Sequence, residues 1–128
     1  MRNLVFLMLI GLSVSVQADG QWYDCSVNEF YVLAEDGNLQ SKQAGYEGQT
    51  FRVDRKAGVI IGDKINTLYN VDVVASNPEE PGIFSLVNYS RKENGEIRRL
   101  STLTVQDYGN VKPFVLSEGN YIFTGICN

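Results

Sequence analysis

Residues 83–106 read IFSLVNYSRKENGEIRRLSTLTVQ, and this stretch decides the fold class of the chain. Two runs of alternating apolar and polar residues flank the segment KENGE (92–96), whose Asn-Gly pair is typical of a β-hairpin turn. A two-residue loop would set like charges opposite each other on both sides of the turn. A three-residue loop with Gly95 in a bulge instead sets Lys92 opposite Glu96, so we predict this register.

The same register assigns the hairpin side chains to two faces. It places one apolar set together on a single face, which we expect to pack against the core: Ile83, Val87, Tyr89, Ile97, Leu103 and Val105. Asn88-Tyr89-Ser90 matches the pattern of a glycosylation site. It lies in the middle of a predicted strand, so we expect it to be unused.

Further strand-like runs, each ended by a turn signal, lie on both sides of this hairpin. Between residues 54 and 58, Asp54 can accept from backbone N–H groups and Gly58 can adopt a positive φ, which predicts another hairpin. Residues 40–49 are polar with two glycines and predict a long loop. The tally is about eight short strands joined by turns, which predicts an all-β antiparallel meander closing as a small barrel or sandwich.

The N-terminal segment has the three parts of a secretory signal. Arg2 supplies the positive charge, residues 4–16 supply the apolar run, and Val16-Gln17-Ala18 supplies the small residues of a cleavage site. We therefore predict a signal peptide over residues 1–18 and a single exported domain over residues 19–128, in the periplasm or secreted. The apolar run is too short to span a membrane, so no stable insertion is expected after cleavage.

The only two cysteines are Cys25 and Cys127, near the two ends of this domain. In an exported chain an even count indicates a disulfide, and only one pairing is possible. We expect it to join the first and last strands and so to hold the sheet closed.

The net charge of the chain limits the classes of partner that it can bind. The chain has a formal net charge of −4, and loss of Arg2 with the signal peptide leaves −5. An acidic domain is a poor match for nucleic acid. A cationic protein partner fits this charge, although the charge also serves solubility.

The residue types present leave little room for catalysis. Histidine is absent, which removes histidine-dependent nucleophilic and zinc chemistry, and both cysteines are expected in a disulfide. Glu79 and Glu80 are adjacent, but they lie in a proline-bounded loop where we expect them to be hydrated. We predict no catalytic residue, no metal site and no cofactor.

Candidate binding residues lie near predicted turns. Arg91, Lys92, Arg98 and Arg99 gather at the end of the 83–106 hairpin. They form either an anion-recognising tip or a solvated hairpin end with Arg99 stacked on Tyr89. Tyr46 and Tyr108 fall in glycine-containing loops and are candidates for exposed contacts with a partner.

Residues 51–62, FRVDRKAGVIIG, resemble the F-x-V-D-R-K-T-G-x-I-x-G stretch of a group of small exported proteins of Gram-negative bacteria. The segments YDC (23–25) and FTGIC (123–127) are similar to theirs as well, and Ala57 departs from their usual threonine. That group has no assigned activity, so the resemblance implies an exported Gram-negative protein and no more.

A shorter set of residues resembles the C-type lysozyme inhibitors, which are small β-barrels with a Tyr-x-Cys start and a late cysteine. Here Ala44-Gly45-Tyr46 takes the place of their inhibitory loop, without its serine. Gly20-Gln21-Trp22 and Asp107-Tyr108 are similar to short lipocalin signatures. These resemblances imply an inhibitor or a ligand carrier.

The sequence thus predicts an exported, non-enzymatic binding or inhibitor module that acts through its loops, for which a cationic protein is the expected partner. The alternative is a small carrier of an apolar ligand in the mouth of the barrel. A carboxylate-based hydrolase is a third interpretation, and it requires two acids facing each other across a cleft.

Overall fold

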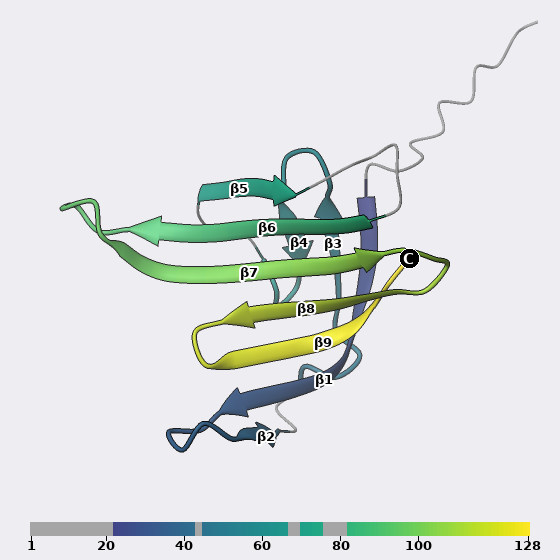
Figure 1. Ribbon diagram of the computed structural model, residues 1–128, viewed down its shortest axis with the longest axis horizontal. Coiled ribbons are helices and arrows are strands. Elements are labelled where there is room, and N and C mark those ends of the chain that lie inside the picture. Colours follow the sequence, from purple (N-terminus) through teal and green to yellow (C-terminus); the bar gives the residue numbers. More distant parts are fainter. Residues whose placement is uncertain (1–21, 43–44, 67–69, 76–81) are drawn as a thin grey trace, which may run out of the picture.

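The computed structural model describes residues 22–42, 45–66, 70–75 and 82–128 of the chain. They form a single antiparallel sheet that curls into a half-barrel (Figure 1). Its strands are β1 (Trp22–Leu33), β2 (Leu39–Ser41), β3 (Thr50–Asp54), β4 (Ile60–Gly62), β5 (Asn70–Ala75), β6 (Gly82–Arg91), β7 (Ile97–Asp107), β8 (Lys112–Glu118) and β9 (Tyr121–Cys127). Their order across the sheet is β4-β3-β1-β9-β8-β7-β6-β5, with β2 paired to the end of β1.

The prediction of an all-β antiparallel fold is confirmed, with β5 to β9 forming a meander. The described strands number nine rather than about eight, because β2 overlaps the start of the stretch expected to be one long loop, residues 40–49. Leu39 to Ser41 pair with Tyr31 to Leu33, where β1 extends past β3 and offers a free ladder edge.

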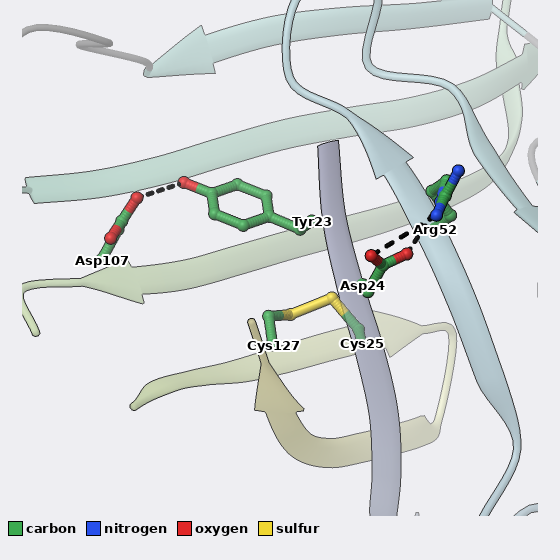
Figure 2. The surroundings of a disulfide bond; sticks show 6 residues. All are labelled: Tyr23, Asp24, Cys25, Arg52, Asp107 and Cys127. Atoms are coloured by element: carbon green, nitrogen blue, oxygen red, sulfur yellow. Dashed lines mark hydrogen bonds and ion pairs between the residues drawn. A yellow bond between two sulfur atoms is a disulfide. The ribbon is translucent and has the colours of Figure 1, made fainter. Parts of the chain in front are cut away.

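The first and last strands are neighbours, and the predicted disulfide joins them. Cys25 of β1 lies directly opposite Cys127 of β9, with a sequence separation of 102 and both side chains buried (Figure 2). Beside this pair, the backbone N–H of Asn128 donates to Asp24 O at 2.8 Å. The seam between β1 and β9 is therefore fastened covalently at the end where β1 begins.

A second feature of this seam is a β-bulge in β1. The register shifts between Val27 and Glu29, opposite Gly125 of β9. A Cβ on Gly125 would lie 1.9 Å from Ser26 O and 2.7 Å from Phe114 Cε1. Only a glycine lets the bulged backbone approach this closely, and the bulge lets β1 bend around the barrel, as Figure 1 shows.

The concave face of the half-barrel holds the core. Five apolar side chains from five adjacent strands are cross-strand partners in one continuous line, which we call the apolar row: Leu86, Leu103, Leu116, Phe123 and Phe30. All five are buried. Nearer the end where β1 begins, Phe84 pairs with Val105 and Val105 with Phe114. These side chains fill the concave side of the curled sheet, so the core forms without the second sheet that a sandwich has.

The turn between β6 and β7 has the predicted three-residue form. The N–H of Lys92 donates to Glu96 O at 2.8 Å, Gly95 has φ of +87°, and Lys92 Nζ lies 3.7 Å from the Glu96 carboxylate. The predicted register, with the lower repulsion, is therefore confirmed at the turn itself.

Beyond the turn, the predicted faces are wrong. A bulge follows at once, since Arg91 pairs with Ile97 but Ser90 pairs with Arg99. The extra residue shifts the register by one, and a one-residue shift moves every β6 side chain to the opposite face relative to β7. Leu103 and Val105 are buried as expected, but they face Leu86 and Phe84, while Ile83, Val87 and Tyr89 point away from the core.

The hairpin between β3 and β4 brings the two ends of the curled sheet together. As predicted, Asp54 Oδ1 accepts from the N–H groups of Lys56 and Ala57 at 2.9 and 3.1 Å, and Gly58 has φ of +74°. A Cβ on Gly58 would lie 2.6 Å from Val71 Cγ1 of β5. The edge strands β4 and β5 thus approach through this turn, which closes the core on that side.

Candidate functional site

A pocket of about 300 Å³ opens at the end of the half-barrel where β6 meets β7 and β8 meets β9. One more line of cross-strand partners, the polar row, crosses these four strands beside the apolar row: Asn88, Ser101, Glu118 and Tyr121. All four line the pocket, and Leu116 and Phe123 of the apolar row form its base. We call this site the mouth pocket. Its wall is polar and its base is apolar.

Two inward-facing polar side chains at the mouth have no partner. Asn88 is 8% exposed and Ser90 is 9% exposed. Neither Asn88 Oδ1 nor Ser90 Oγ has a hydrogen bond to any described residue. An unpaired buried polar group costs about 1–3 kcal/mol of stability, so native proteins keep few of them and each requires an explanation.

On the convex face of the same strands, the polar side chains do have hydrogen-bond partners. There, Thr102 Oγ1 and Ser117 Oγ lie 2.8 Å apart, and Ser85 Oγ lies 3.1 Å from Thr104 Oγ1 and 3.2 Å from Leu103 O. The outward polar side chains therefore hydrogen-bond across the strands, whereas those at the mouth do not. The difference favours a binding role over a purely structural one for Asn88, which lines the mouth pocket; Ser90 lies next to it on the same face of β6 but is not part of the lining.

The structure divides the predicted binding residues into two groups. Tyr46 and Arg99 line the mouth pocket. Tyr46 is half-buried, with its ring 5.0 Å from each of Phe30 and Phe123, so it belongs partly to the core rather than to an exposed contact. Arg99 reaches the pocket because the bulge places it opposite inward-facing Ser90.

The other four predicted residues lie away from the pocket. Arg91 takes the place expected for Arg99, with its guanidinium 5.1 Å from the Tyr89 ring and Nη1 donating to Gly95 O at 2.8 Å. Lys92 pairs with Glu96, and Arg98 is exposed beside them. Tyr108 is 64% exposed at the opposite end of the half-barrel. Glu79 and Glu80 lie outside the described residues.

At that opposite end, an ionic cluster surrounds a buried tyrosine. Tyr23 OH donates to Asp107 Oδ2 at 2.8 Å (Figure 2), and Arg55 and Lys112 lie 3.8 and 3.7 Å from the same carboxylate. The Arg55 guanidinium also stacks 4.8 Å from the Tyr23 ring. These contacts satisfy Asp107 and close this end of the core, so the cluster has a structural role.

This cluster predicts a loss of stability at alkaline pH. Burial, and then the hydrogen bond to Asp107, raise the pKa of Tyr23 far above its ordinary value. The folded state therefore retains a proton that the unfolded chain loses, and the free energy of unfolding should fall as the pH rises from ~9 to ~11. Urea denaturation across this range measures the fall. Tyr23→Phe should show a shallower fall, and an equally steep fall would contradict the assignment.

A second hollow, of about 470 Å³, lies on the convex face over β1, β3 and β4. Two of its charged side chains, Asp24 and Arg52, pair with each other, with Nε 2.7 Å from Oδ1 (Figure 2). Its lining includes neither Asn88 nor Ser90.

The fold and site together define a class: a disulfide-closed antiparallel half-barrel with a half-polar pocket at one end. Among the described residues, no three metal-ligating side chains gather, and no helix is long and apolar enough to cross a bilayer. No protein-family model, curated protein or solved structure matches the chain. The function must therefore be argued from the site itself.

Proposed function

We propose that this chain is an exported, non-enzymatic binding protein that holds a small molecule in the mouth pocket. The observation that carries the proposal is the buried Asn88 Oδ1, which lines the pocket and has no hydrogen-bond partner among the described residues. A concave site with an apolar base and a few convergent polar groups is the usual form of a small-molecule site. Its volume of about 300 Å³ lies at the lower end of the range for such sites.

Three features support export. The disulfide between Cys25 and Cys127 is consistent with a location outside the reducing cytoplasm. The signal-like segment at residues 1–18, which lies outside the described residues, favours the periplasm or secretion. The likeness to small exported Gram-negative proteins supports the same placement.

If Asn88 binds the ligand, its unpaired oxygen lowers the free energy of unfolding of the ligand-free protein. Replacing Asn88 by leucine removes the unpaired oxygen and adds apolar surface beside Leu86 and Leu103 of the apolar row. In the absence of ligand, the free energy of unfolding should rise by about 1–3 kcal/mol. Thermal unfolding and urea denaturation of the purified proteins measure the change.

The matched control is Thr102→Val on the convex face of the adjacent strand. It breaks a satisfied pair and leaves Ser117 Oγ without its partner, so it should destabilise by roughly 1 kcal/mol. If Asn88→Leu also destabilises, then Asn88 is held by structural water or by the fold itself, and the proposed site is wrong.

A second candidate function is an inhibitor that acts through the loops on a cationic enzyme. The observation that favours it is Tyr108, which is 64% exposed in the loop between β7 and β8 and suits a protein contact. The acidic charge of the chain fits a cationic partner. The β6–β7 hairpin is exposed from 91 to 100 as well (Figure 1), but its four basic side chains would repel such a partner.

This candidate predicts inhibition of one or more lysozymes at low ionic strength, which salt should weaken because the charges attract through solvent. Tyr108→Ala should reduce the inhibition about tenfold if this ring is a central contact. No binding to a panel of lysozymes at low salt removes the candidate.

A further inference from the structure

We propose that the ligand of the mouth pocket is a small, hydroxyl-bearing ring of the sugar class rather than an apolar chain. This rests on the proposed function and names the chemistry that the same site recognises. Three features of the pocket support it: the order of the two side-chain rows, the atoms that lack partners, and the volume.

The base of the pocket is closed by Leu116 and Phe123, which are 4% and 5% exposed, and the more accessible rings of its lining are those of Tyr46 and Tyr121. Phe123 lies in the apolar row between Leu116 and Phe30, and its ring stacks on Phe30 with centroids 4.9 Å apart. Tyr46 adds a second ring, and its edge-to-face contact with Phe123 holds it in place. The C–H face of a pyranose ring packs against surfaces of this kind, where it removes apolar area from water.

The wall of the pocket requires hydrogen-bond donors from the ligand. Asn88 Oδ1, which lines the pocket, is an acceptor without a partner among the described residues. A ligand hydroxyl group satisfies it. An alkyl chain would not satisfy it and would seal it from water, and a bare anion would place negative charge against it.

The rim carries charges of both signs, from Lys64 and Arg99 and from Glu118. Lys64 Nζ already donates to Gly45 O at 3.2 Å and lies 5.6 Å from the Tyr46 ring centre, so this cation holds the neighbouring loop. Arg99 gives donors and Glu118 gives acceptors for hydroxyl groups. The lining therefore fits an amphipathic ligand that both donates and accepts hydrogen bonds.

The volume supports one ring. About 300 Å³ is small for a lipid chain that must be enclosed along its length, because sites for drug-sized ligands extend to about 1,000 Å³. A single pyranose, or the terminal ring of a longer glycan that extends into solvent, fits this space.

The test is an NMR titration of the ¹⁵N-labelled domain with two kinds of probe. One kind is a panel of monosaccharides (glucose, galactose and N-acetylglucosamine), and the other is dodecanoate. We expect at least one sugar to shift the amide resonances of Asn88, Ser101 and Leu116. Asn88→Leu should weaken that binding at least tenfold, and Thr102→Val should leave it unchanged.

The outcomes separate the ligand class from the binding function. Shifts at these amides with dodecanoate and none with any sugar would overturn the sugar assignment and leave a binding protein for apolar ligands. No shifts with either probe would also overturn the sugar assignment. The stability of Asn88→Leu, measured without any ligand, would then decide whether the mouth pocket is a binding site. Sugar-induced shifts that persist in Asn88→Leu would place the sugar elsewhere and overturn the inference.

Discussion

Replacing Gly125 by alanine is expected to lower the free energy of unfolding by about 3–5 kcal/mol, among the largest effects of a single methyl group in a small domain. The added Cβ would lie 1.9 Å from Ser26 O, and that oxygen belongs to the backbone of the bulged strand β1. A side chain can rotate away from such a contact, but a strand held by β3 and β9 cannot. Urea denaturation followed by circular dichroism measures the loss.

The matched control is Gly109→Ala. A Cβ added at Gly109 would meet no atom within 4 Å, and the residue has no positive φ, so the substitution should change the stability by less than about 0.5 kcal/mol. Equal effects of the two substitutions would show that β1 and β9 do not approach as closely as the structure has them.

The second large effect is expected from opening the disulfide. Cys25 and Cys127 close a loop of about 100 residues, and on the chain-entropy model this loop contributes ~4–5 kcal/mol to stability. The double variant Cys25→Ala with Cys127→Ala should therefore have a much lower urea midpoint. Small domains have a total stability of about 5–15 kcal/mol, so we expect a large fraction of the double variant to be unfolded at 37 °C.

Reduction provides the control for this prediction. A thiol reductant should lower the midpoint of the natural protein and leave that of the double variant unchanged, because no other cysteine is present. A reduced protein as stable as the oxidised one would mean that strand pairing alone holds the seam between β1 and β9.

Much of the fold follows from local signals in the sequence. Asp54 and Gly58 have the side chain and the conformational freedom that one turn requires, and Gly95 has the freedom that the next requires. The disulfide follows from the count of cysteines alone. In each case the deciding chemistry lies within a few residues or admits only one pairing.

The candidate site could not be predicted from such local signals, because a bulge just after the turn changes which β6 side chains face inward. A regular ladder from the 92–96 turn sets Ser85 opposite Leu103 and turns Asn88 outward. The bulge at Arg98 instead sets Leu86 opposite Leu103 and turns Asn88 inward. No local pattern predicts this shift, because the regular ladder would turn more apolar β6 side chains inward than the bulged one does.

The contacts between distant segments that form the site could not be predicted from the sequence either. The mouth pocket needs Tyr46 and the loop at Lys64 to reach strands more than 20 residues away in the chain, and no local pattern encodes that approach. Curling of the sheet produces it, and the curl depends on Gly125 and the bulge in β1.

The pairing of β1 with β9 has a consequence for how the chain is made and moved. Nearly the whole domain must be synthesised before β1 meets the strand that lies beside it, since their cysteines are 102 residues apart. Contacts this distant in sequence make folding slow. A nascent chain therefore has no complete native state to reach until its last strand is available. Under the export proposed above, this topology would keep the chain unfolded until its last strand had crossed the membrane.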